Sequence, residues 1–190
     1  MVVAPFMIKY VIGLPHATGE IFMFYVGSSL LSLPLWLALS RRIGKKWTWM
    51  AGLVVGMTGY IALFFIGPGE LRWMQMVVSM TGACSACGTM IGSSILADVI
   101  DADELETGER KEGAYYAVSN MVKKAAASLT AIVTGIVLQW TGFEPNATQS
   151  PETVEALRLL FSILPACGYF LGGILFLKFS FNEFEHSEVR

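Results

Sequence analysis

The chain alternates long apolar runs with short polar connections. A helix needs about 20 apolar residues to cross the roughly 30 Å of bilayer hydrocarbon. Four runs reach that length without a charged side chain: residues 21–40, 47–66, 73–96 and 159–179. A fifth run, 114–140, carries Lys123 and Lys124 near its middle, and the apolar segment 1–14, interrupted by Lys9, resembles the last part of a helix. The pattern predicts an all-α membrane protein with five full spans and a partial first one.

The connections between these runs carry turn residues. Residues 13–15, 67–69 and 142–151 contain glycine and proline, which are the strongest local markers of turns. Pro34 and Pro165 lie inside runs and are expected to bend the helices there, which membrane helices tolerate when neighbours satisfy the freed carbonyl groups. Because no segment resembles a soluble domain, the whole chain (1–190) is predicted to form one transmembrane domain.

Composition agrees with a membrane protein. The chain is 54% hydrophobic and 15% charged, whereas soluble domains carry about 25% charged residues. The formal net charge of −2 gives no reason to expect nucleic acid as a partner. Glycines four residues apart are expected to let membrane helices approach closely. These pairs are Gly52/Gly56, Gly88/Gly92 and Gly168/Gly172.

Basic residues outside the runs are unevenly distributed between the two ends of the predicted spans. One end carries Arg41, Arg42, Lys45, Lys46, Arg110, Lys111, Lys178 and Arg190 if the chain crosses at every run. The other end carries Arg72 and Arg158. Under the positive-inside rule the first end is cytoplasmic. This predicts cytoplasmic loops at 41–46 and 97–113 and a cytoplasmic tail at 180–190, in a multi-pass protein of the plasma (inner) membrane.

Lys123 and Lys124 are the strongest functional signal. They lie about nine and ten residues into their run, or roughly 15 Å deep at a helical rise of about 1.5 Å per residue. A lysine at that depth costs roughly 2.5–3.5 kcal/mol, and charges inside membranes commonly line a solute or ion path. Adjacent helical residues point about 100° apart, so both lysines can border a polar cavity but only one can point into its centre. The alternative is that one lysine extends to the interface or pairs with a carbonyl group.

The two lysines have no acidic partner inside the predicted spans. Glu20 and Asp98 lie only at the ends of runs. Because a buried charge normally needs a partner, the compensating acids are expected on helices outside this chain.

A second group of charges lies between the runs 73–96 and 114–140. It comprises Asp98, Asp101, Asp103, Glu104, Glu106, Glu109, Arg110, Lys111 and Glu112. Asp98 and Asp101 share a face if the helix continues past residue 96. We predict an ion-pair network that closes the cytoplasmic end and opens during a conformational cycle; a solvated loop is the alternative. No His or Cys accompanies these carboxylates, so no metal site is expected.

Other chemistry has little support in the sequence. There is no nucleotide-binding loop, no nucleophile–base pair and no metal-ligand motif, so neither an enzyme nor a cofactor is expected. Cys84 and Cys87 have redox spacing, but packing is their expected role in a glycine-rich apolar helix.

The acidic connection resembles that of a known family. Residues 97–104 (ADVIDADE) and 107–113 (TGERKEG) are similar to the connection between helices ten and eleven of glycoside-pentoside-hexuronide:cation symporters. The likeness extends to Tyr116 and to residues 120–124 (NMVKK), 9–13 (KYVIG), 41–46 (RRIGKK) and 182–186 (NEFEH). These symporters, which include the melibiose carrier, belong to the major facilitator superfamily. The resemblance covers nearly the whole chain and implies its C-terminal six-helix bundle.

The resemblance also implies roles for individual residues. Lys124 corresponds to a helix-eleven lysine beside the sugar and cation sites, and Asn120 to a polar position facing the same cavity, near Tyr116. Lys123 replaces an apolar residue, which adds a second charge and points to an anionic substrate. Thr89 stands where the melibiose carrier has a cavity tryptophan, which argues against melibiose itself. The family's cytoplasmic charge network corresponds to Asp98, Asp101, Arg110 and Glu112.

The function implied by the resemblance is cation-coupled symport of a sugar or glycoside-like solute by alternating access. The coupling cation (Na⁺, H⁺ or Li⁺) is expected to be bound mainly by an N-terminal six-helix bundle, which is the expected partner of this half. Alternatives are an organic-acid or lipid-like solute, or a truncated membrane protein that docks on a partner without moving solute.

Overall fold

The computed structural model describes residues 4–177. The predicted cytoplasmic tail 180–190, with Arg190, and Lys178 lie outside the described residues. The described elements are α1 (Ala4–Phe6), η1 (Met7–Ile12), η2 (Pro15–Ala17), α2 (Thr18–Phe64), α3 (Leu71–Thr107), α4 (Glu112–Trp140), α5 (Pro151–Arg158), η3 (Leu159–Ile163) and α6 (Leu164–Leu177). No β-strand occurs among them, and the prediction of an all-α protein is confirmed.

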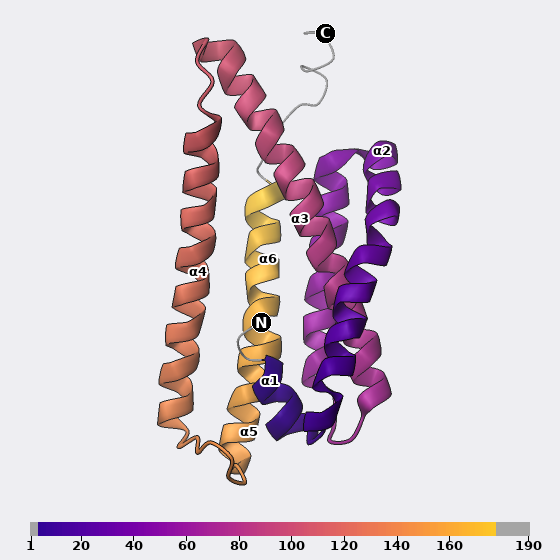
Figure 1. Ribbon diagram of the computed structural model, residues 1–190, viewed down its shortest axis with the longest axis vertical. Helices are drawn as coiled ribbons and strands as arrows, with labels where there is room; N and C mark the ends of the chain where they lie inside the picture. The colour runs from indigo at the N-terminus through magenta and orange to yellow at the C-terminus, as the bar shows by residue number, and fades with distance from the viewer. Residues whose placement is uncertain (1–3, 178–190) are drawn as a thin grey trace.

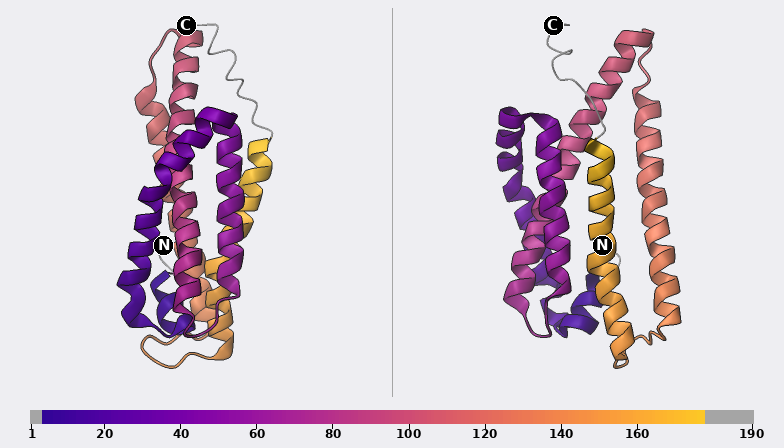
Figure 2. Two further views of the ribbon diagram at one scale, coloured as in Figure 1. Left: turned by 90° about the vertical axis from the view of Figure 1, so that its right-hand side faces the viewer. Right: turned by 180° about the vertical axis from the view of Figure 1, so that it is seen from behind.

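Long helices running side by side make up the fold (Figures 1 and 2). Four helical segments are long and apolar enough to cross a membrane: Pro15–Phe64, Leu71–Thr107, Glu112–Trp140 and Pro151–Leu177. The first of these folds back on itself at Gly44, whose φ of 81° and ψ of 164° lie outside the helical region. Such a positive φ favours glycine, which has no Cβ to clash. The chain therefore passes along the molecule five times, as the five full runs predicted.

Two predicted loops are shorter in the structure than in the sequence analysis. Helical residues flank Gly44 on both sides, so the loop predicted at 41–46 is a reversal at a single glycine. Helix α3 continues through Thr107 and ends at Gly108, whose φ is 70°, so the loop predicted at 97–113 reduces to residues 108–111. The prediction was wrong there because residues 97–107 are charged yet contain good helix formers (Ala, Leu and Glu) and no glycine or proline.

The last pass begins earlier than the run 159–179. Pro151 occupies the first turn of α5, and the Ser150 hydroxyl accepts a hydrogen bond from the Thr153 amide at 3.2 Å, which is a favourable start for a helix. The helix then widens into the π-helical turn η3 immediately before the segment that contains Pro165. Proline lacks a backbone N–H, so the wider turn accommodates the lost hydrogen bond.

Close packing of α2 against α3 depends on small residues. A Cβ atom at Gly52 would lie 2.6 Å from Cys87 Sγ of α3, and one at Gly56 would clash with Cys84 Sγ of α3 and lie 2.7 Å from a Tyr169 ring carbon of α6. A Cβ at Gly92 would lie 3.3 Å from the Trp49 ring. The predicted close approach is therefore confirmed at these three glycines. It is wrong at Gly88, Gly168 and Gly172, where nothing lies within 4 Å, because these positions face open space in the described part of the chain.

The core consists of two apolar clusters. One includes Met7, Leu63, Met74 and Leu157, all almost completely buried, near the end of the molecule where the chain begins. The other surrounds Cys87 and includes Trp36, whose indole N–H donates a hydrogen bond to the Ala83 carbonyl at 2.8 Å. Cys84 and Cys87 are buried free thiols, which agrees with a packing role.

Helix α4 packs differently from the others. Thr134 is its one buried residue, and only its final part, with Val133, Val137 and Leu138, packs against the first core cluster. The rest stands away from the neighbouring helices in the views of Figures 1 and 2. Helix α4 is thus held mainly at its ends.

The end of α4 that follows Trp140 is fixed by an aromatic and polar contact with η1 and α1. The Phe143 ring lies edge-on to the rings of Phe6 and Tyr10, with centroid separations of 5.5 and 5.1 Å. Lys9 Nζ donates a hydrogen bond to Asn146 Oδ1 at 2.6 Å, and the backbone N–H of Asn146 donates to the Tyr10 hydroxyl at 2.9 Å. We call these five residues the end clamp.

Replacement of Gly82 by valine is expected to destabilise the protein. A Cβ at Gly82 would lie 2.5 Å from Ser28 Oγ and 3.1 Å from the Tyr25 carbonyl carbon, and helix backbone cannot move aside as a side chain can. Overpacking of this kind costs about 1–3 kcal/mol. Chemical unfolding in detergent micelles measures the loss. The matched control is Gly172→Ala, which has free space around it; equal stability of both variants would contradict the proposed packing.

Candidate functional site

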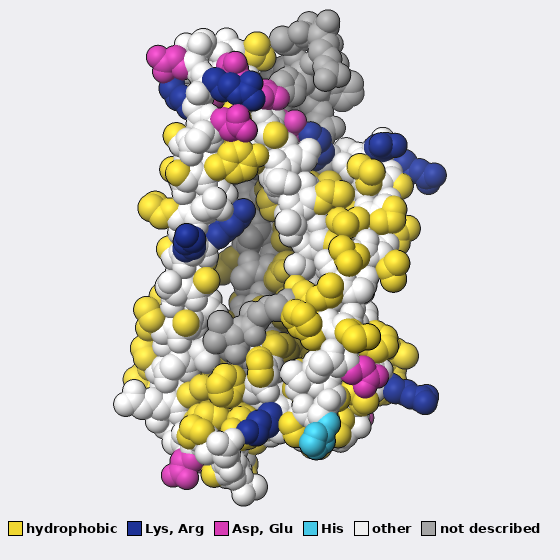
Figure 3. Space-filling model, in the orientation of Figure 1, with side chains coloured by type: hydrophobic (Ala, Val, Ile, Leu, Met, Phe, Trp, Pro, Cys, Tyr) yellow, Lys and Arg dark blue, Asp and Glu magenta, His cyan; other side chains and the backbone are white. Residues whose placement is uncertain are grey.

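A cleft of about 860 Å³ lies between α3, α4, α6 and the second half of α2, with a few polar groups in a largely apolar lining. Helix α4 contributes Tyr116, Ser119 and Lys123, which are spaced three and four residues apart and so share one face. Lys123 is the one charged residue lining the cleft. Figure 3 shows the surface hollowed between α4 and the other helices, with basic side chains on α4 at that level.

The opposite wall of the cleft belongs to α3 and carries hydroxyl groups on small side chains. Thr89 Oγ1 donates a hydrogen bond to the Ser85 carbonyl at 2.8 Å, and Ser93 Oγ donates to the Thr89 carbonyl at 2.9 Å. Because each hydroxyl hydrogen is engaged within the helix, the oxygen atoms can still accept hydrogen bonds from a solute. The cleft therefore has Lys123 on its α4 side and, on its α3 side, the hydroxyl oxygens of Thr89 and Ser93 as hydrogen-bond acceptors.

The remaining lining consists of aromatic rings, of the aliphatic side chains Leu53, Ile95, Leu96 and Val99, of Cys84 and of glycines. Trp49 and Phe176 lie with ring centroids 4.7 Å apart, and Tyr169 of α6 also borders the cleft. Such rings offer apolar faces beside the polar groups, the usual composition of small-molecule sites.

The predicted cavity residues divide between two faces of α4. Tyr116 and Lys123 are brought together in the cleft, whereas Asn120 and Lys124 do not line it and are exposed. This division follows from the helical rotation of about 100° between adjacent residues. A role for Asn120 and Lys124 in the cavity stays a prediction.

Several lining residues were not singled out from the sequence. Ser85 and Ser93 lie four residues before and after Thr89, the position that the resemblance already placed in the cavity, and that spacing puts all three on one helix face; this signal was available. Ser119 lies one turn before Lys123 and could have been found in the same way. Tyr169 has no such signal, because it meets the cleft only through the packing of α6.

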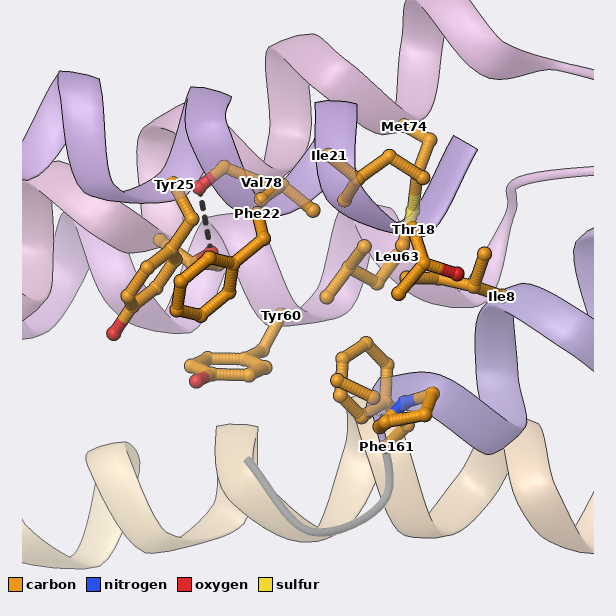
Figure 4. Close-up of a pocket in the computed structure, with 13 residues that line it drawn as sticks. Ile8, Thr18, Ile21, Phe22, Tyr25, Tyr60, Leu63, Met74, Val78 and Phe161 are labelled. Atoms are coloured by element: carbon orange, nitrogen blue, oxygen red, sulfur yellow. Dashed lines mark hydrogen bonds between the residues drawn. The ribbon is translucent and has the colours of Figure 1, made fainter. Parts of the chain in front are cut away.

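A second cavity, of about 210 Å³, has an apolar lining (Figure 4). The rings of Phe22, Tyr25, Tyr60 and Phe161 border it, and no charged residue does. The Thr81 hydroxyl donates to the Val78 carbonyl at 2.9 Å, so its hydrogen is already engaged. This cavity is not suited to a polar or charged solute.

The predicted charge network separates into two groups. Asp98 forms an ion pair with Lys45, the residue after the reversal at Gly44. Arg110 lies 3.2 Å from Glu112 and 3.7 Å from Glu104. The hydrogen bond to Glu112 raises the pKa of Arg110, and the charges of Glu104 and Asp101 act in the same direction. Asp101 itself is exposed.

The Lys45–Asp98 pair links the second half of α2, just after the reversal at Gly44, to α3. The Lys45 and Asp98 side chains are 30% and 19% exposed, whereas the Arg110 side chain is 62% exposed. The first pair is therefore the better shielded from solvent. Both residues were predicted at the cytoplasmic end of the molecule but not as a pair; their opposite charges were the available signal.

The long apolar helices are those of a multi-pass membrane protein, and the cleft between them is lined in part by a lysine, hydroxyl groups and aromatic rings. The sequence model of the family described as MFS/sugar transport protein matches residues 1–183. The chain belongs to this family, which confirms the resemblance found in the sequence. The match places it in a family of transport proteins.

Individual relatives are similar over most of this chain. An uncharacterized symporter of Synechocystis is 29% identical over 91% of the chain and 33% of its own length. A putative sulfoquinovose importer of Salmonella typhimurium is 29% identical over 92% of the chain and 36% of its own length. A glucuronide carrier protein homolog of Escherichia coli is 25% identical over 92% of the chain and 38% of its own length. The chain thus spans about a third of the length of these relatives.

The Lys45–Asp98 pair is expected to contribute measurably to stability. A double-mutant cycle with Lys45→Gln and Asp98→Asn should give a coupling free energy of about 1 kcal/mol, at the upper end for partly exposed pairs. Unfolding in detergent provides the measurement. The Glu109–Lys111 pair, separated by 3.2 Å but more exposed, is the matched control and should give a coupling close to zero. Equal coupling in both pairs would contradict the assignment.

Proposed function

We propose that this chain forms the C-terminal six-helix part of a secondary transporter that moves a sugar-like solute in symport with a cation. The observation that carries the proposal is Lys123 halfway along a membrane-spanning helix, in a cleft with hydroxyl and aromatic groups. Family membership supports it. So do the names of the relatives, one a symporter and two associated with sugar derivatives, a glucuronide and sulfoquinovose.

Lys124 has a different proposed role from Lys123. It is exposed and turned away from the cleft, yet it occupies the same depth in the membrane, where a charge without a partner is costly. We propose that acids on an N-terminal bundle compensate Lys124 and respond to the cation (Na⁺, H⁺ or Li⁺) and to solute occupancy. Solute would then bind near the midplane, and rocking of the two bundles would alternate access to it.

The charged end of the molecule is proposed to be cytoplasmic and to act as a gate. The Lys45–Asp98 pair and the group around Arg110 hold together segments that meet at this end. Breaking them would favour the state in which the cleft opens to the cytoplasm.

Neutralising Lys124 is expected to abolish cation-driven uptake. The full-length gene product in proteoliposomes with an imposed cation gradient is assayed for accumulation of labelled sugars, sugar acids among them. Lys124→Gln should reduce accumulation roughly 10- to 100-fold, the value of a charge-assisted contact. Arg72→Gln, which removes an exposed charge at the opposite end, is the control. Unchanged accumulation by Lys124→Gln would contradict the role of this lysine, and absence of uptake by the unsubstituted protein would favour a non-transporting membrane protein.

Neutralising Asp98 is expected to expose the cleft. A cysteine introduced at Ser93, in a background where the exposed Cys167 is replaced by serine, reports access of a polar thiol reagent. Asp98→Asn should raise the labelling rate up to about fivefold, because loss of such a pair shifts the equilibrium by at most about 1 kcal/mol. Glu109→Gln is the control, and equal labelling rates would count against the gate.

A further inference from the structure

We propose that the tip of α2, where the chain reverses at Gly44, binds the phosphate group of an anionic phospholipid through Arg41 and Arg42. The acyl chains of this lipid lie on the exposed apolar face of the helical segment that follows the reversal. We call the surface that comprises Arg41, Arg42, Trp47 and Val54 the lipid face. The proposal concerns the bilayer around the protein and does not depend on the transport of any solute.

The four basic residues around the reversal have two different kinds of surroundings. Lys45 forms an ion pair with an aspartate of α3, and Lys46 Nζ donates a hydrogen bond to the Leu177 carbonyl of α6 at 3.3 Å. These two contacts hold the reversal against the neighbouring helices. Arg41 and Arg42 are exposed instead, and neither forms an ion pair with a residue between 4 and 177. Two guanidinium groups are therefore directed away from the helices that the structure describes.

No acid of the described chain compensates these two arginines. The acids at this end of the molecule lie on α3 and in residues 109–112, where they pair with other basic residues. Figure 3 shows basic side chains at the tip of α2 set apart from the acidic side chains that gather over the end of α3. Glu20 is the one acid within α2, and it lies about 30 Å from Arg41 along the helix. A guanidinium group offers several N–H donors in a planar arrangement that matches phosphate oxygens. The tip of α2 is thus suited to an anionic phosphate group.

Exposed apolar side chains begin immediately after the basic tip. Trp47, Val54 and Ile61 recur every seven residues, or about two helical turns, so they share one face of the second half of α2. Trp47 and Val54 are 58% and 54% exposed. Tryptophan is enriched at the level of the lipid headgroups. Val54 lies about 10 Å beyond Trp47, within the roughly 15 Å of hydrocarbon that one leaflet provides. The arginines therefore lie at the depth of the phosphates and Val54 at the depth of the acyl chains.

The combination of charge and apolar surface favours a phospholipid over a free anion. A free phosphate would contact only the arginines and would leave the apolar face without an occupant. A zwitterionic lipid carries its own cation beside the phosphate, so it gains less from two further positive charges. An anionic lipid uses both parts of the surface, because basic residues near the membrane surface attract its headgroup.

The test uses phosphatidylglycerol with a photoactivatable group in one acyl chain. The full-length gene product in detergent micelles is labelled with this probe, and the labelled residues are mapped by peptide mass spectrometry. The probe should label residues 47–61. Unlabelled phosphatidylglycerol should compete roughly 10- to 30-fold better than phosphatidylcholine with the same acyl chains. The double variant Arg41→Gln/Arg42→Gln should lose this preference, Arg41→Lys/Arg42→Lys should retain most of it, and Arg72→Gln, which removes an exposed charge at the other end of the molecule, should retain all of it.

Four results would overturn the proposal. Equal competition by the two lipids would exclude selection of an anionic headgroup. An unchanged preference in Arg41→Gln/Arg42→Gln would exclude the arginines as its cause. Competition by glycerol 3-phosphate as strong as that by phosphatidylglycerol would assign the site to a free phosphate. Absence of label at residues 47–61 would show that another part of the protein covers this face. If the glutamine variant does not fold, competition in the unsubstituted protein and in the lysine variant still decides the question.

Discussion

The cost of holding two ammonium groups at membrane depth governs the arrangement of this protein. Each lysine in the middle of α4 is unfavourable by a few kcal/mol unless polar surroundings compensate it. The structure separates α4 from its neighbours where the lysines lie and packs it only near Val133 to Leu138. The same separation creates the cleft. The arrangement that keeps the lysines out of the apolar core therefore also opens the space between α4 and the other helices.

Most of the fold follows from hydropathy. Apolar runs of sufficient length correspond to the passes of the structure, and the reversal falls at Gly44, where a positive φ is required. Hydropathy failed at the end of α3, because it detects transfer into lipid and not helix formation, and residues 97–107 form a helix while remaining charged. Likewise, the spacing of Gly168 and Gly172 indicates that another helix could approach closely at these positions. It does not indicate whether a neighbouring helix lies there.

The sequence allowed us to predict which residue types line the candidate site and how deep they lie in the membrane. It did not allow us to predict which way their side chains point. The position of Lys123 along its run indicated a polar cavity, but whether Lys123 or Lys124 faces it depends on the rotation of α4 relative to its neighbours. The partner of Asp98 depends in the same way on how the turn at Gly44 meets α3. The rotation of a helix about its axis and its contacts with other helices depend on tertiary packing. These cannot be predicted from the hydropathy and residue spacing of a single sequence.

The end clamp fixes one end of α4, so a tilt of the helix about that end moves its middle part. The Phe6, Tyr10 and Phe143 rings and the Lys9–Asn146 hydrogen bond fix one extremity, while Lys123 lies roughly 25 Å from that end of the helix at about 1.5 Å per residue. A tilt of about 5° around the clamp therefore displaces the ammonium group by about 2 Å. Displacements of that size make or break a hydrogen bond, so a slight angular change at a distant aromatic contact is enough to change which groups the Lys123 ammonium can reach.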